Sequence, residues 1–173
     1  MPHWAGISMV DLNNCEYLNI GCGKTRFENT INMDVADNKY TKVDIVGSVL
    51  DIPFPNERFK GVIFSHVLEH LHQEDHRRAM FEIKRVLKVG GTAYIEVPDL
   101  MLACKYFVEN FQGRRDYWYM CIYGRNLYET DVHKSGITIE YLTDLLFSSG
   151  FGHLKWPECD PASAGIVVFA EKL

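Results

Sequence analysis

The chain has 173 residues, a formal net charge of −5 and 47% hydrophobic residues, which fits one folded domain over residues 1–173 with a single buried core. The acidic balance argues against a nucleic-acid partner, because phosphate binding relies on clustered Lys and Arg. The five cysteines are odd in number and include no C-x-x-C pair, which favours a cytoplasmic location over a disulfide framework or zinc finger. No run of about 20 apolar residues predicts a membrane span, and no basic, apolar leader predicts a signal peptide.

Short apolar runs predict a series of strands in the first hundred residues, at 17–20, 30–34, 43–47, 61–65 and 92–97. Between the last two, residues 75–88 carry apolar side chains at helical spacing, with Asp75 at the start and Gly90-Gly91 expected to end the helix. The prolines of the 51–55 stretch predict a loop there. Strands therefore alternate with helical segments.

The pattern changes after residue 100. Aromatic residues crowd the stretch 100–136, which we expect to begin as a helix and continue as irregular chain. Residues 139–149 predict another helix, followed by Gly150, and residues 151–156 and 165–170 predict a closing β-hairpin. The alternation predicts an α/β fold with a mostly parallel sheet.

Chemically useful residues follow the predicted strand ends. In parallel sheets, ligands bind beyond the carboxyl ends of the strands, so these residues should gather along one edge. Asp34 ends the second strand, where an acid can accept hydrogen bonds from two ribose hydroxyls. An ordinary tight turn and a solvated acid remain the alternatives at each position. The residues concerned are Gly21-Cys22-Gly23, Asp34, Asp51, Ser65-His66 and Pro98-Asp99.

Only about ten residues separate the first two strands, whereas a parallel crossover normally needs a dozen or more. The first helix must therefore be shortened or lost. A dinucleotide pyrophosphate binds at that helix N-terminus. The spacing thus disfavours a dinucleotide and favours a cofactor without phosphate.

Five segments in order resemble class I S-adenosylmethionine-dependent methyltransferases, and most of all the small enzymes of the type-11 methyltransferase group: YLNIGCGK (17–24), NMD (32–34), DIPFP (51–55), FKGVIFSHVLEHL (59–71) and EIKRVLKVGGT (82–92). The resemblance implies a Rossmann-like, mostly parallel seven-stranded sheet of order 3-2-1-4-5-7-6. It also implies an antiparallel C-terminal hairpin and agrees with a shortened first helix.

The resemblance further implies S-adenosyl-L-methionine as cofactor and methyl transfer to a small-molecule O- or N-nucleophile. The turn at Gly21 would line the methionine moiety, Asp34 the ribose, the Asp51 loop the adenine, and His66 the sulfonium. Asn19 stands where the family usually has an acid. An alternative is a module that binds the cofactor or its demethylated product without turnover. The implied cofactor-binding set is Asn19, Gly21, Cys22, Gly23, Asp34, Asp51, Ile52, Ser65 and His66.

A competing motif overlaps this set. His66-Val-Leu-Glu-His70 matches H-x-x-E-H, in which two histidines on a helix bind zinc and Glu69 acts as general base of a hydrolase. That motif must lie on a helix, whereas here it follows a predicted strand directly. We therefore expect no metal site and keep the zinc hydrolase only as an alternative.

Two histidines are candidates for a general base toward the acceptor. His66 follows the fourth strand, and His133 precedes the last helix, where Asp131 could orient it. Pro98-Asp99 is a further place for acceptor contacts. Residues 100–136 would form a lid or acceptor-binding insertion, although their aromatic side chains equally suit core packing or the surface of a homodimer. A monomer remains compatible with the sequence.

Overall fold

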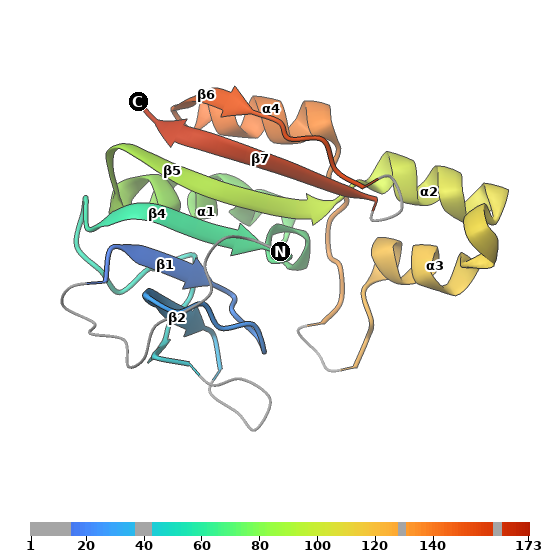
Figure 1. Ribbon diagram of the computed structural model, residues 1–173, viewed down its shortest axis with the longest axis horizontal. Coiled ribbons are helices and arrows are strands. Elements are labelled where there is room, and N and C mark those ends of the chain that lie inside the picture. The colour runs from blue at the N-terminus through green and yellow to red at the C-terminus, as the bar shows by residue number, and fades with distance from the viewer. Residues whose placement is uncertain (1–14, 37–42, 128–130, 161–163) are drawn as a thin grey trace.

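The computed structural model describes residues 15–36, 43–127, 131–160 and 164–173. Within them, seven strands form one sheet in the order β3-β2-β1-β4-β5-β7-β6 (Figure 1). Neighbours from β3 to β5 pair in parallel, and β7 runs antiparallel to both β5 and β6. The predicted strand order and hairpin are confirmed. The strands are Tyr17–Ile20 (β1), Thr30–Asp34 (β2), Ile45–Val46 (β3), Phe59–Ser65 (β4), Leu87–Pro98 (β5), Phe151–Lys155 (β6) and Gly165–Lys172 (β7).

The longer helices take two positions around this sheet. Helices α1 and α4 lie behind it and contact each other, whereas α2 and α3 lie beyond the carboxyl end of β5 (Figure 1). The predicted insertion therefore projects from the edge at which β1, β4 and β5 end. The helices are Leu68–His70 (η1, a 3-10 turn), Gln73–Val86 (α1), Leu100–Glu109 (α2), Phe111–Gly113 (η2, also 3-10), Arg115–Tyr123 (α3) and Ile139–Ser148 (α4).

The crossover from β1 to β2 contains no helix. Residues 21–29 form turns only, which confirms the expected loss of the first helix. Gly21 and Gly23 both take left-handed backbone conformations, with φ of 66° and 51°. Residues of this turn therefore bring the chain directly from the end of β1 to β2.

The end of α1 differs from the prediction. The helix stops at Val86, and β5 begins at Leu87, so Gly90-Gly91 lies inside the strand instead of ending the helix. Leu87 is fully buried and pairs with Phe59, which lets the chain turn from helix to strand without losing core contacts. The pairing then shifts to Thr92 beside Gly61, and Gly90, with φ of 74°, lies in this irregular stretch.

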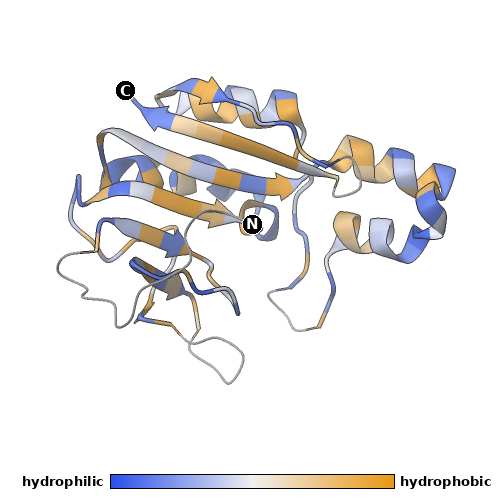
Figure 2. Cartoon of the chain, viewed as in Figure 1, coloured by the Kyte–Doolittle hydropathy of each residue, from blue (hydrophilic) through white to orange (hydrophobic). Residues whose placement is uncertain are grey.

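Apolar side chains form two separate clusters. The main one joins the sheet to α1 and α4, and Figure 2 shows the hydrophobic interiors of the central strands. The second lies between α2 and α3 around Trp118, which is fully buried and donates its indole N–H to the Phe111 carbonyl at 3.0 Å. This cluster explains why residues 115–123 are helical where the sequence predicted irregular chain.

None of the helices in the described ranges has the length and hydropathy required to cross a lipid bilayer.

The separation of the two clusters predicts a local effect for Trp118→Ala. Removing a fully buried indole costs about 3–5 kcal/mol, and Trp118 packs only within the α2–α3 cluster. We expect amide hydrogen exchange to lose protection in α2 and α3 while β4 and β5 keep theirs. Tyr119→Ala, which removes a side chain that is 51% exposed on the same helix, is the matched control. Equal loss of protection in the sheet would contradict the separation.

Candidate active site

The turn after β1 and the end of β2 form one side of the site. The Gly23 N–H donates to Oδ2 of Asp34 at 2.8 Å, and the Cys22 N–H donates to the Met33 carbonyl at 3.1 Å. Asp34 is half-buried, as a ligand-facing acid would be. Burial raises the pKa of the Cys22 thiol to about 11, with Asp34 adding to the effect. The Cys22 thiol is therefore uncharged at neutral pH.

Asn19 lies under this turn rather than on its surface. Its side chain is 3% exposed, and its amide donates to the Thr25 carbonyl at 3.0 Å and to Oδ1 of Asn32 at 3.1 Å. The Asn32 amide in turn donates to Asp44 at 3.0 Å. Asn19 thus holds the turn in shape. Asn32 and Asp44 are residues that sequence reasoning missed, because a buried polar pair has no local sequence signal.

The predicted adenine loop is anchored from α1. The Ile52 N–H donates to Glu82 at 2.8 Å, and the Arg85 guanidinium donates to the Ile52 carbonyl at 2.8 Å. The Ile52 side chain is 2% exposed and packs in the core, so it offers no open face to a ring. Asp51 is exposed beside it. The loop therefore presents a carboxylate on a rigidly held backbone.

His66 lies between two carboxylates at the ends of β4 and β5. Its Nδ1 lies 3.3 Å from Oε1 of Glu69, and its Nε2 lies 3.8 Å from Oε1 of Glu96. The backbone of His66 is left-handed, with φ of 55°, a strained conformation for a residue with a Cβ. Ser65 and Tyr94 donate from their hydroxyls to Oε2 of Glu96 at 2.8 and 2.9 Å.

These contacts set the protonation states of His66 and Glu96, which together with Glu69, Ser65 and Tyr94 form the His66 network. Hydrogen bonding to Glu69 first, and to Glu96 second, raises the pKa of His66 to about 10. The hydrogen bond with His66 lowers the pKa of Glu96 to about 2, and the hydrogen bonds from Ser65 and Tyr94 contribute to this shift by smaller amounts. His66 is therefore an imidazolium at neutral pH, with no lone pair to accept a proton. The prediction of His66 as a general base does not fit this chemistry.

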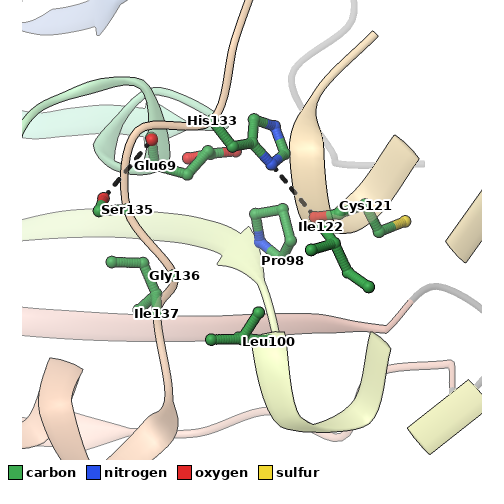
Figure 3. Close-up of a pocket in the computed structure, with 9 residues that line it drawn as sticks. All are labelled: Glu69, Pro98, Leu100, Cys121, Ile122, His133, Ser135, Gly136 and Ile137. Carbon is green, nitrogen blue, oxygen red and sulfur yellow. Dashed lines mark hydrogen bonds between the residues drawn. The ribbon is translucent and has the colours of Figure 1, made fainter. Parts of the chain in front are cut away.

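A small hollow lies beyond the end of β5 (Figure 3). Its lining includes Glu69, Pro98, Cys121, His133 and the 135–137 stretch. Figure 3 shows the Glu69 and His133 side chains on adjoining walls.

Backbone carbonyls orient two histidines here. Nδ1 of His133 lies 3.1 Å from the Cys121 carbonyl, and Nδ1 of His70 lies 3.1 Å from the Val132 carbonyl. A carbonyl only accepts, so each Nδ1 carries a proton, and a neutral ring held in this way has its lone pair on Nε2. Burial lowers the pKa of His133, which keeps its ring neutral. One potential ligand atom from each of Glu69, His70 and His133 lies within 4.8 Å of the others.

The expected pairing of Asp131 with His133 is not found, whereas the acceptor contacts expected at Pro98-Asp99 stay a prediction, with Pro98 in the lining of the hollow. Asp131 accepts from the Leu127 N–H at 3.1 Å, and the Cys121 carbonyl orients His133 instead. Asp99 caps α2, because its Oδ1 accepts from the Met101 and Leu102 N–H groups. Carbonyl partners of this kind come from folding and leave no trace in the sequence.

The zinc-hydrolase alternative is also not supported. Its motif needs both histidines on one helix, with Glu69 free to act as a base. Here His66 lies outside any helix and pairs with Glu69, while Glu69 and His70 occupy the single 3-10 turn η1.

Comparison with known proteins agrees with this fold. Residues 25–95 match the model of a methyltransferase domain. An uncharacterized methyltransferase of Schizosaccharomyces pombe is 41% identical over 61 residues, which are 35% of this chain and 21% of the relative. The match therefore spans about a fifth of that relative's length.

Solved structures share the architecture along nearly the whole chain. A SAM-dependent methyltransferase from Methanosarcina mazei superposes with a TM-score of 0.65 at 18% identity, covering 93% of each chain. The 1,6-didemethyltoxoflavin-N1-methyltransferase of Burkholderia thailandensis, crystallised with 1,6-didemethyltoxoflavin and S-adenosylhomocysteine, gives 0.61 at 14% identity over 90% of this chain and 70% of its own. Residues 25–95 therefore match a methyltransferase domain, and the chain as a whole shares the fold of solved S-adenosylmethionine-dependent methyltransferases.

Proposed function

We propose that the chain binds S-adenosylmethionine along the carboxyl edge of β1, β2 and β4 and transfers its methyl group to a small-molecule O- or N-nucleophile. The observation that carries this is the left-handed turn at Gly21 and Gly23, bonded to the half-buried carboxylate of Asp34. The turn lies where β1 has β2 on one side and β4 on the other, the position at which open α/β sheets bind ligands.

The residues fit this cofactor. A Cβ built on Gly23 meets no atom within 4 Å, so there is open space beside the turn. The Gly23 N–H donates to Oδ2 of Asp34, and a carboxylate has the capacity to accept further hydrogen bonds, such as those of ribose hydroxyls. Residues 21–29 offer no helix N-terminus for a phosphate, and S-adenosylmethionine has none.

The chain's own groups hold and orient the bound molecule. Asp34 accepts from the ribose, and the Asp51 loop, held by α1, borders the adenine. His66 is an imidazolium that lies between the carboxylates of Glu69 and Glu96. The three groups together carry one net negative charge, which favours a cationic sulfonium nearby. The bound cofactor supplies an electrophilic methyl group, so the protein's main task is in-line positioning.

We assign the acceptor to the hollow beside His133, with residues 100–136 as the acceptor-binding insertion of a single domain. Leu100, Cys121, Ile122 and His133 from this segment line the hollow. His133 is neutral and oriented by a carbonyl, so its Nε2 can take a proton or a cation, which His66 cannot do. His133 is therefore the histidine that serves the acceptor.

The cofactor site predicts tight binding that depends on the charge of Asp34. Calorimetric titration should show one S-adenosylmethionine or S-adenosylhomocysteine per chain. Asp34→Asn keeps the shape of the side chain but removes a charged acceptor, which costs about 1.5–3 kcal/mol, or about 10- to 150-fold in Kd. Asp144→Asn, on the exposed face of α4, is the matched control. Absence of binding by the native chain at millimolar ligand would overturn the proposal.

Turnover is tested separately by following S-adenosylhomocysteine formation with a panel of small hydroxyl and amine acceptors. A binding-competent chain that forms product with a member of the panel supports the enzyme. A chain that binds the cofactor and never forms product with any acceptor would instead be the module without turnover.

The His66 network predicts an unusual titration. The ring should stay protonated through pH 8 in ¹⁵N NMR spectra, because its pKa is about 10. Glu96→Gln removes one paired carboxylate and should move the midpoint down toward the ordinary value of about 6.5. A midpoint near neutrality in the native chain would contradict the charge assigned to His66.

The pKa shifts of His66 and Glu96 set the pH range over which their pairing stabilises the folded chain. His66 has a raised pKa, so its contribution is full below its ordinary value of 6.5 and is lost as the pH rises through about 10. Glu96 has a lowered pKa, so its contribution is full above 4.5 and is lost as the pH falls through about 2. The network therefore stabilises most between these limits, from 4.5 to 6.5. The gain is at most about 1 kcal/mol, because the His66 side chain is 56% exposed.

A further inference from the structure

We propose that Glu69, His70 and His133 bind one divalent transition-metal cation at the wall of the acceptor hollow. These residues come from two segments, the 3-10 turn η1 and the stretch before α4, which meet only in the folded chain. One potential ligand atom from each lies within 4.8 Å of the others. The binding itself does not depend on the proposed methyl transfer.

Both histidines are already in the tautomer that binds metal. The Val132 and Cys121 carbonyls hold the Nδ1 protons of His70 and His133, each at 3.1 Å. A metal-binding histidine typically donates its other ring N–H to such a partner, which fixes the ring and leaves the second nitrogen free. The two rings also pack edge to face, with centroids 4.9 Å apart, so their positions are mutually constrained.

Glu69 supplies a second, independent observation. Its side chain is buried to about 1% exposure, and within the described part of the chain Oε2 has no hydrogen-bond partner, whereas Oε1 pairs with His66. A buried, unpaired carboxylate oxygen costs about 1–3 kcal/mol or more when nothing satisfies it. A cation bound to Oε2 would satisfy that oxygen without breaking the His66 contact.

The spacing requires only a small adjustment. Zinc–nitrogen bonds are about 2.0–2.1 Å long, so two ligands of one ion lie up to about 4.2 Å apart. The ligand atoms, which lie within 4.8 Å of one another, therefore have to approach by about half an ångström, which small side-chain rotations can supply. Two imidazoles and one carboxylate suit zinc, iron, cobalt or nickel more than magnesium or calcium, which prefer oxygen ligands.

Three protein ligands leave at least one coordination position open. Glu69 and His133 line the hollow, so a cation held by them would lie at its wall. This role, which rests on the proposed function, would be to hold an acceptor oxygen or nitrogen. The lone pair on Nε2 of His133 then binds the cation instead of taking a proton.

Cobalt(II) is the probe, because its visible absorption reports coordination by nitrogen. EDTA-treated full-length chain should bind one cobalt ion, measured by absorption and by calorimetry. His70→Ala, His133→Ala and Glu69→Gln should each weaken binding by at least about tenfold, as loss of even an outer-shell partner does. His72→Ala, which removes an exposed histidine two residues from His70, is the matched control and should bind as the native chain does.

The outcomes are distinguishable. Sub-stoichiometric cobalt binding by the native chain, or unchanged affinity in His133→Ala, would overturn the metal site. Circular dichroism and S-adenosylhomocysteine titration of the same variants separate a folding defect from loss of a ligand. Retained S-adenosylhomocysteine binding with lost cobalt binding supports the site, while failure of S-adenosylhomocysteine binding in the native chain overturns only the proposed function.

Discussion

The buried residue Glu69 connects the two halves of the site. Its backbone carbonyl accepts from the Lys134 and Ser135 N–H groups at 2.8 and 3.2 Å, which fastens the segment before α4 to the end of β4. Its Oε1 pairs with His66 beside the expected sulfonium. Among the residues that the structure describes, none hydrogen-bonds to its Oε2. The position of His133, and with it the shape of the hollow, depends on Glu69 together with the Cys121 and Tyr123 carbonyls of α3.

The cofactor side depends on a different constraint, the loss of the first helix. With only residues 21–29 between β1 and β2, no α-helix is available to support the turn at Gly21. The buried amides of Asn19 and Asn32 take over that task through hydrogen bonds with each other and with the Thr25 carbonyl. This shorter connection suits a nucleoside cofactor without phosphate better than a pyrophosphate, which binds at a helix N-terminus.

Two histidines that look equivalent in the sequence differ because of their surroundings. His66 is paired with two carboxylates and carries an extra proton at neutral pH, whereas His133 is half-buried beside a carbonyl, which lowers its pKa. Opposite charge raises the pKa of an imidazole, and burial without such charge lowers it. In the proposed function the two rings therefore have separate tasks, an electrostatic one for His66 beside the cofactor and a lone-pair donor for His133 beside the acceptor.

The sequence by itself determined the sheet. Apolar runs, the glycine turn and the short first crossover are local signals, and the family motifs set the strand order in which they pair. The boundary at Leu87 and the helix at 115–123 were misjudged, because a fully buried leucine fits helix or strand and because Trp118 acquires its partners only on packing. Tertiary structure alone decided the charge of His66, the carbonyls that orient His70 and His133, and the meeting of Glu69 with both. The contact between His70 and the Val132 carbonyl, for example, joins residues 62 positions apart, and no local pattern encodes such a separation.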